Sequence, residues 1–139
     1  MSELDHDLIE AAASLIAMRS DDCYHTTAAT ARARDGRIVS AVNVYHFTGG
    51  PCAELVVIGR AVADGAADLE QIVAVGDRDR GILPPCGRCR QILFDLYPTI
   101  GVSVDDGAGP ALTPIAELLP LGARWDANVG SIPPGLTST

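Results

Sequence analysis

The sequence predicts a single α/β domain in which helices cover both faces of one mixed β-sheet. Its 139 residues are the size of one domain, and 47% of them are hydrophobic, enough for one core. Helix-like and strand-like segments alternate along the chain, as in folds that layer helices over a sheet. We expect the domain to span residues 1–125 and a mobile tail to span 126–139, where no periodicity is found.

Capping and turn residues place the elements of the first half. Ser2 and Asp5 form a capping-box pair before apolar residues at helical spacing. Asp35-Gly36 supplies the positive φ angles of a hairpin turn, and Gly65 is placed to end a helix. The expected elements are a helix ending near residue 18, strands over 26–34 and 37–44, and a helix over 52–63.

An apolar run and several prolines place the elements of the second half. The run 69–76 is apolar and β-branched, which suits a buried strand. Pro84-Pro85 precedes a helix that Pro98 closes, and Thr113-Pro114 is a cap and first-turn pair. The expected elements are a strand over 69–76, a helix over 87–96, a strand over 100–104 and a short helix over 113–119.

The charge balance of the chain argues against polyanionic partners. Asp and Glu number 18 against 10 for Lys and Arg, a net charge of −8, and such a surface repels nucleic-acid polymers and anionic membranes. No apolar run is long enough for a membrane span, and the acidic start MSELDHDLIE is unlike a signal peptide. We therefore expect a cytoplasmic protein with a small, neutral or cationic ligand.

Three of the four cysteines lie at predicted helix starts. In a reducing cytoplasm we expect cysteines to act as metal or chemical groups instead of disulfides. Cys86 and Cys89 are three residues apart in Pro-Cys-Gly-Arg-Cys, and Cys52 opens the preceding crossover helix. Because both crossover helices begin at the same edge of a sheet, the three sulfurs can converge on one ion. Alone, the Cys86–Cys89 pair could equally be a redox motif.

Three thiolates around a zinc ion leave one tetrahedral position open, which is typical of a catalytic zinc. Water at that position has its pKa lowered to about 7. Glu54 follows Cys52 by two residues and lies near enough to exchange protons with that water. Two other interpretations are that Glu54 is a solvated helix-start carboxylate and that Cys23 completes a four-thiolate structural site. Cys23 has no partner at ligand spacing and fits better as a packing residue.

Two arginines beside Cys89 bear on the charge of this cluster. Three thiolates overcompensate a divalent ion, and Arg88 or Arg90 could offset the excess together with the two helix starts. The alternative is that both side chains face solvent.

Cys52-Ala53-Glu54 followed by Pro85-Cys86-Gly87-Arg88-Cys89 matches the zinc deaminase signature, with Cys in place of the first His. At these residues the sequence resembles the cytidine deaminase superfamily, and within it the blasticidin S deaminase group. The matching segments are VNVYHFTGGPCAELVVIG (42–59), RGILPPCGRCRQILFDLYP (80–98) and ELLP (117–120). The resemblance implies a three-layer α-β-α sandwich with a mixed five-stranded sheet, zinc on the three cysteines, and a homotetramer whose active sites neighbouring chains complete.

The activity that the resemblance implies is zinc-dependent hydrolysis of an amine. Water replaces the amine at C4 of cytosine, giving uracil and ammonia, while Glu54 protonates ring N3 and then the departing amine. The expected substrate is blasticidin S or a related aminonucleoside. The alternatives are a cytidine or deoxycytidine deaminase of pyrimidine salvage and, in another class, a non-catalytic zinc-stabilised binding module.

Departures from the family pattern concern the sugar side of the substrate. Where cytidine deaminases carry Asn-x-Glu, this chain has Asn43-Val44-Tyr45, and a site without the glutamate should hold ribose poorly. The resemblance keeps Asn43 as a substrate contact and assigns contacts with the base to the Ala53 amide and to the carbonyls around Pro84-Pro85. His25 stands where the family has tyrosine, so this wall of the pocket differs.

Three further residues are candidate substrate contacts. Thr26 keeps a hydroxyl where the family has serine, although a β-branched strand residue explains it as well. Arg80 can pair with the carboxylate on the sugar ring of blasticidin S, unless it belongs to a surface charge cluster with the preceding residues 77–79. Trp125, the only tryptophan, is either a lid over the ligand or a packing residue.

Overall fold

The computed structural model describes residues 3–19 and 23–125. In chain order, the elements of this part are α1 (His6–Arg19), β1 (Thr27–Ala33), β2 (Ile38–Val42), α2 (Ala53–Ala63), β3 (Leu69–Gly76), β4 (Gly81–Leu83), α3 (Gly87–Leu96), β5 (Gly101–Asp105), β6 (Pro110–Pro114) and the 3-10 helix η1 (Ile115–Leu118). The expected tail over 126–139 and the expected cap at Ser2 lie outside the described residues.

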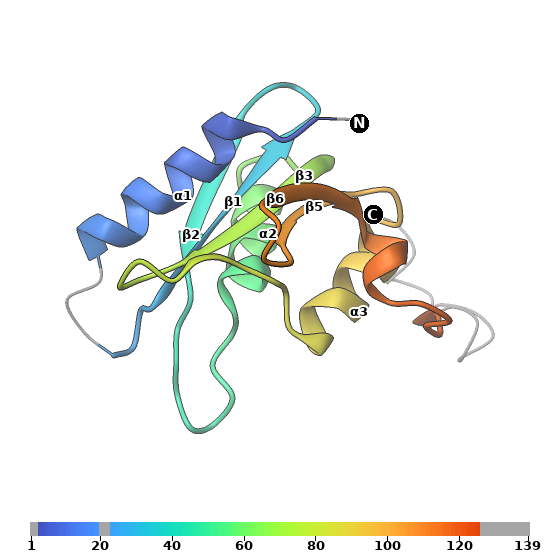
Figure 1. Cartoon of the computed structure of the whole chain (residues 1–139). Helices are drawn as coiled ribbons and strands as arrows, with labels where there is room; N and C mark the ends of the chain where they lie inside the picture. The colour runs from blue at the N-terminus through green and yellow to red at the C-terminus, as the bar shows by residue number, and fades with distance from the viewer. Residues whose placement is uncertain (1–2, 20–22, 126–139) are drawn as a thin grey trace.

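The strands form one mixed sheet (Figure 1). The main path runs in the order β2-β1-β3-β5-β6, and β4 pairs with β3 beside this path. β3 and β5 are parallel, and the other pairs are antiparallel. The prediction of a mixed sheet is confirmed. The five strands of the main path match the expected number, and the short β4 makes a sixth.

Helices cover both faces of the sheet, which confirms the three-layer architecture (Figure 1). On one face, α1 packs Leu8, Ala12 and Ile16 against β1 and β3. On the opposite face, a larger core joins α2, α3 and η1 to the sheet and includes the buried Val57 and Leu93. Each fully buried aliphatic side chain of this kind stabilises the fold by roughly 1.5–3 kcal/mol. Within the described part of the chain, no helix is long and apolar enough to cross a bilayer.

Asp5 fixes the start of α1. Its Oδ1 accepts a hydrogen bond from the Leu8 backbone N–H at 3.2 Å, and its Oδ2 accepts one from Arg32 Nε of β1 at 2.8 Å. One carboxylate therefore caps the helix and ties it to the sheet. The predicted helix is confirmed, and Asp5, the second residue of the expected capping-box pair, makes a capping contact.

The segment 110–118 differs from the prediction. Thr113-Pro114 is expected to open a helix, whereas both residues belong to β6 and η1 follows at Ile115. Thr113 pairs with Val102 of β5, and Pro114 pairs with Gly101. Because β6 is the last strand of the sheet, a proline that lacks an N–H is tolerated there. The proline that favours a helix start is equally compatible with this edge strand.

The two helices that carry the cysteines begin at one edge of the sheet. α2 connects β2 to β3, and α3 connects β4 to β5. The expected helices over 52–63 and 87–96 are confirmed within one residue. β2 and β3 both run antiparallel to β1, so their carboxyl ends point the same way. α3 follows β4, which runs back antiparallel along the end of β3 with Leu83 opposite Ala74. Cys52, Glu54 and Cys86 therefore come together beside Ala74.

Candidate active site

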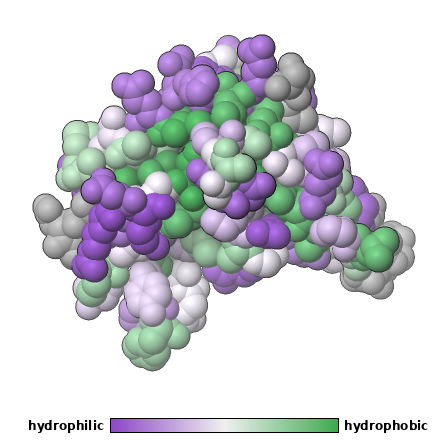
Figure 2. All heavy atoms as spheres, in the orientation of Figure 1, coloured by the Kyte–Doolittle hydropathy of each residue, from purple (hydrophilic) through white to green (hydrophobic). Residues whose placement is uncertain are grey.

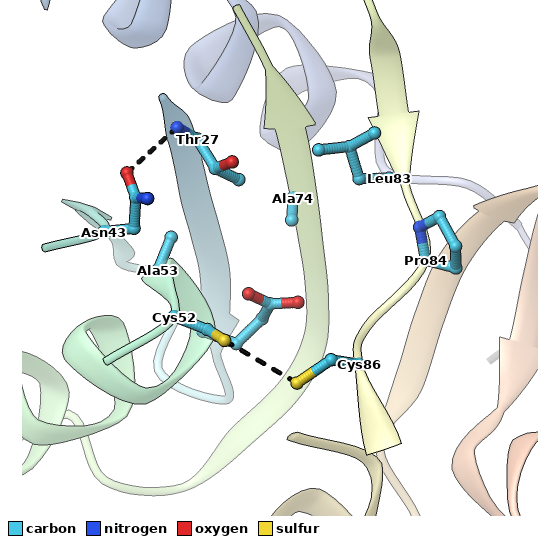
Figure 3. A pocket seen from close by; sticks show the side chains of 9 residues that line it. Thr27, Asn43, Cys52, Ala53, Ala74, Leu83, Pro84 and Cys86 are labelled. Carbon is cyan, nitrogen blue, oxygen red and sulfur yellow. Dashed lines mark hydrogen bonds between the residues drawn. The ribbon is translucent and has the colours of Figure 1, made fainter. Parts of the chain in front are cut away.

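Cys52 and Cys86 are the N-cap residues of α2 and α3. Both have extended backbone, with φ −65° and ψ 156° at Cys52 and φ −69° and ψ 170° at Cys86, and neither side chain caps its own helix. Their sulfurs are therefore free to point into the space between the two helix starts. The two Sγ atoms lie 3.6 Å apart and face one another (Figure 3).

Cys89 completes a group of three sulfur atoms. It lies in the first turn of α3 with 0% exposure, and the three Sγ atoms all lie within 4.8 Å of one another. Zinc–sulfur bonds of about 2.3 Å place tetrahedral sulfur ligands roughly 3.8 Å apart, so this donor set fits one zinc ion. All four cysteines are free thiols, and the exposed Cys23 does not belong to the group.

The surroundings of the three thiols set their affinity for protons. Burial raises the pKa of Cys89, and the nearby Glu54 carboxylate adds to this effect. Burial also raises the pKa of Cys52, although Arg88 acts in the opposite direction. At Cys86, burial opposes ionisation, but the backbone N–H of Cys89 and the neighbouring thiols outweigh it and lower the pKa. Metal binding to these thiols therefore releases protons.

Glu54 lies in the first turn of α2 and is only 6% exposed. It lines the same pocket as Cys52 and Cys86. Burial raises the pKa of its carboxyl above the usual 4.5, which brings the group closer to the range where it can both accept and release a proton. The interpretation of Glu54 as a solvated helix-start carboxylate is wrong, because the side chain is buried.

The pocket that Cys52, Glu54 and Cys86 line has a volume of about 150 Å³. In Figure 3, Asn43 and Ala53 lie on one side of it, Leu83 and Pro84 lie on the other, and the sulfurs of Cys52 and Cys86 lie at the lower end. The full lining is Thr27, Asn43, Cys52, Ala53, Glu54, Ala74, Leu83, Pro84 and Cys86.

Similarity to known proteins agrees with this geometry, although no family model matches the sequence. A cytidine deaminase of Halalkalibacterium halodurans is 34% identical over 67 residues, 47% of this chain and 50% of that protein. The crystal structure of cytidine deaminase from Burkholderia pseudomallei superposes with a TM-score of 0.69 and 27% identity, over 87% of this chain and all (100%) of that one. The Blasticidin-S deaminase of Bacillus cereus is 35% identical over 130 residues, 87% of this chain and 93% of that protein. The chain belongs to the cytidine deaminase superfamily.

In this member of the cytidine deaminase superfamily, Asn43 lines the pocket but is largely engaged within the chain. Its Oδ1 accepts hydrogen bonds from the backbone N–H groups of Thr26 at 2.7 Å and Thr27 at 3.0 Å. Its Nδ2 donates to Thr26 Oγ1 at 3.1 Å. Asn43 therefore holds the start of β1, and the residue of this pair that lines the pocket is Thr27, not Thr26.

Arg80 and Trp125 lie outside the lining of the pocket. Arg80 Nη2 donates to Asp77 Oδ1 at 3.0 Å and to the Thr26 carbonyl at 2.8 Å, so its guanidinium joins the β3–β4 turn to the start of β1. Trp125 is 41% exposed, and its backbone N–H donates to Asp95 Oδ1 of α3 at 3.0 Å. Their roles as substrate contacts stay predictions.

The two arginines beside Cys89 point in different directions. Arg88 is exposed, and its Nη2 lies 3.5 Å from the carbonyl oxygen of Gly50, near Cys52. Arg90 is half-buried and donates to the carbonyls of Pro85 and Leu118. The alternative in which both side chains simply face solvent is wrong for Arg90.

Three residues that line the pocket are absent from the prediction: Thr27, Ala74 and Leu83. Ala74 and Leu83 are register partners across β3 and β4, and β4 has only three residues, too few for a periodic pattern. The position of Thr27 in the pocket could have been predicted from strand alternation. Thr27 shares one face of β1 with Ala29, which packs in the core on the α2 side, so strand alternation places Thr27 on that side.

Proposed function

We propose that this chain is a zinc-dependent deaminase that hydrolyses the C4 amine of the cytosine in blasticidin S or a related aminonucleoside. One observation carries the proposal: three sulfurs lie within 4.8 Å of one another, and two of them, those of Cys52 and Cys86, line a pocket together with the buried Glu54. That donor set suits zinc with one open position. The net reaction consumes water and yields the uracil product and ammonia.

Cys52, Cys86 and Cys89 hold the ion in this proposal. Zinc bound by three thiolates supplies a polarised water whose pKa falls to about 7. Glu54 would take a proton from the attacking water and deliver it to ring N3, which makes C4 more electrophilic, while the water oxygen bonds to C4. It would then move the proton of the added hydroxyl to the C4 amine, and the C4–N bond would break to release ammonia and leave the C4 carbonyl of uracil. Its burial keeps the carboxyl out of bulk solvent during both transfers.

The base is oriented by backbone groups on both sides of the pocket. Ala53 and Pro84 both line it, on opposite sides in Figure 3. We assign the Ala53 N–H and the carbonyls of the Pro84-Pro85 segment as contacts for the polar edge of cytosine. Groups fixed in a helix start and a proline segment need little reorganisation on binding.

The choice of blasticidin S over a plain nucleoside rests on the sugar side. The named relative from Bacillus cereus is a Blasticidin-S deaminase. Tyr45 replaces the glutamate of the family's Asn-x-Glu and is 65% exposed, while Asn43 Oδ1 is occupied by two backbone N–H groups. A ribose diol therefore loses a carboxylate acceptor and finds the asparagine oxygen already bonded.

The substrate assignment is tested by comparing kcat/KM for blasticidin S, cytidine and deoxycytidine from the change in ultraviolet absorbance. The proposal expects blasticidin S to be preferred. Arg80→Ala should lower kcat/KM for blasticidin S more than for cytidine, which has no carboxylate. Equal losses would show that Arg80 acts only through the Asp77 and Thr26 contacts.

A second candidate is deamination of cytidine or deoxycytidine. Superposition on a cytidine deaminase over 87% of this chain favours it, as does the retention of Asn43 in the pocket. Comparable kcat/KM for cytidine and blasticidin S would establish this alternative. Stable zinc binding with no turnover of any of the three compounds would instead establish the non-catalytic binding module.

We also propose that the enzyme works as a cytoplasmic homotetramer. Apolar side chains are exposed on the segment between β2 and α2, which projects from the molecule (Figure 1), and Phe47 there is 91% exposed. On the face shown in Figure 2, hydrophobic side chains also gather toward the centre. Contact with other copies of the chain would cover such surface.

A further inference from the structure

Arg90 connects the segment before Cys86 to a distant part of the chain. Its Nε donates to the Pro85 carbonyl at 2.8 Å, and its Nη1 donates to the Leu118 carbonyl at 3.0 Å. Its own backbone N–H donates to the Cys86 carbonyl at 2.9 Å. Arg90 thus holds the peptides on both sides of Cys86, one through its side chain and one through its backbone.

The side chain of Pro85 is buried, but the segment between β4 and α3 can make few backbone hydrogen bonds of its own. Pro84 and Pro85 have no N–H, so neither can donate a backbone hydrogen bond. Cys86 is exposed and makes no side-chain cap to its own helix. Cys89, in contrast, is held by complete burial. Besides the burial of Pro85, the position of the Cys86 sulfur therefore depends on what holds the Pro85 carbonyl.

The other end of the Arg90 contact is firmly anchored. Leu118 is the last residue of η1, and Ile115 at the start of η1 is fully buried. The Ile115 backbone N–H donates to the Ile100 carbonyl at 3.0 Å, just before β5. A planar guanidinium with several donors in fixed directions can serve both carbonyls at once, which a lysine ammonium cannot do in the same geometry.

We propose that Arg90 is a positioning residue for the metal: by holding the Pro85 carbonyl against η1, it keeps the Cys86 sulfur where it can share an ion with Cys52 and Cys89. This inference rests on the proposed function, in which Cys86 is a zinc ligand. Loss of an outer contact of this kind typically lowers metal affinity about 10- to 100-fold.

The test compares Arg90→Ala and Arg90→Lys with wild type and with Arg60→Ala. Arg60 is a matched control, because its Nη1 also donates to a backbone carbonyl, that of Ser40, at 2.8 Å, but from the exposed side of α2. Zinc affinity of the reduced proteins is measured by competition with a chromophoric chelator, well below the unfolding temperature of every variant. The thiolate-to-cobalt charge-transfer absorbance of the Co²⁺-loaded proteins reports the sulfur ligands directly.

We expect both Arg90 variants to bind zinc about 10- to 100-fold more weakly than wild type, with reduced charge-transfer absorbance, and Arg60→Ala to match wild type. Wild-type affinity and absorbance in the Arg90 variants would overturn the inference while leaving the zinc site intact. If Arg90→Ala does not fold, Arg90→Lys decides alone. Failure of the wild type itself to bind metal through three thiolates would overturn the proposed function as well.

Discussion

At Cys52 and Cys86, the backbone of a helix start decides where the sulfur points. An N-cap serine or aspartate normally bonds its own helix, whereas these two thiols make no such bond and leave their sulfurs for another partner. Cys89 adds a third sulfur from inside the first turn of α3. The motifs C-A-E and P-C-G-R-C together are enough to predict this group. In P-C-G-R-C, the N-cap residue and the residue three positions later lie on the same side of the helix start, so both sulfurs can face one ion.

Replacing Glu54 by Gln tests its role in proton transfer. The amide keeps the shape of the side chain but cannot accept and return a proton. We expect deamination to become undetectable while about one zinc per chain is retained, since the three sulfurs are untouched. Ultraviolet turnover assays and metal analysis on the same sample check both parts. Residual turnover close to wild type would reject the role.

The buried carboxyl of Glu54 also predicts a pH-dependent effect on stability in the metal-free, reduced chain. Burial raises its pKa in the folded state above the usual 4.5. Below pH 4.5 the carboxyl is protonated in both states and has no effect. As the pH rises through the folded pKa, the folded chain must carry a buried charge and its free energy of unfolding falls.

Glu54→Gln should therefore be more stable than wild type near pH 8, with the difference vanishing below pH 4.5. Urea unfolding across this pH range measures it. Glu117→Gln, at an exposed position of η1, is the matched control. A metal-free Glu54→Gln that is less stable than wild type at pH 8 would contradict the cause assigned to the shift.

At the scale of elements, the crossover connections place the chemistry. Because α2 and α3 both begin at one edge of the sheet, residues 34 positions apart, Cys52 and Cys86, come within 3.6 Å. Periodicity and turn residues predict α2, α3, β3 and the β1–β2 hairpin. They do not predict β4, because its three residues are too few to show a pattern. They do not predict β6, because Thr113-Pro114 is compatible with a helix start and with an edge strand.

The attachment of α1 to the sheet is tested at Asp5. Hydrogen bonding to Arg32 lowers the pKa of Asp5 below its usual 3.8, and the pair is mostly buried, with side-chain exposures of 21% for Arg32 and 16% for Asp5. The stabilisation from this pair is therefore present above pH 3.8 and is lost as the pH falls through the folded pKa.

Asp5→Asn keeps a capping oxygen but loses the ion pair. We expect it to lower the free energy of unfolding by about 1–2 kcal/mol at pH 7, measured by urea titration. The difference from wild type should shrink as the pH is lowered below 3.8. Asp35→Asn removes an exposed aspartate paired with Arg37 and should change stability little. A loss at Asp5 that is the same at pH 7 and pH 3 would contradict the ion-pair explanation.

At the scale of the whole molecule, the alternation of helix-like and strand-like segments predicts an α/β fold with a mixed sheet, and the three-layer structure confirms it. The cluster of Cys52, Cys86 and Cys89 with Glu54 is predictable, because each half of the motif is a local pattern at a helix start and the topology brings the two helix starts together. The part of the pocket that β1, β3 and β4 form is not predictable, because it depends on strand register. Thr27 takes the place expected for Thr26, and the Arg80 side chain bonds Asp77 and the Thr26 carbonyl, neither of which a spacing pattern shows.

The number of chains in the assembled protein is a further property that can be measured. Light scattering of the purified protein is expected to give the mass of four chains if the proposed tetramer forms. Phe47 and its neighbours expose apolar surface that contact with other copies would cover. A mass of one chain at micromolar concentration would contradict the tetramer without affecting the metal site.

X-ray absorption at the zinc edge of the reduced, zinc-loaded protein tests the central claim most directly. Each zinc should have three sulfur neighbours at about 2.3 Å and one oxygen or nitrogen neighbour in the remaining position. Four sulfur neighbours would mean that another thiol closes the site and that no position is left for water, and zinc without sulfur neighbours would mean that the cluster of Cys52, Cys86 and Cys89 does not hold it.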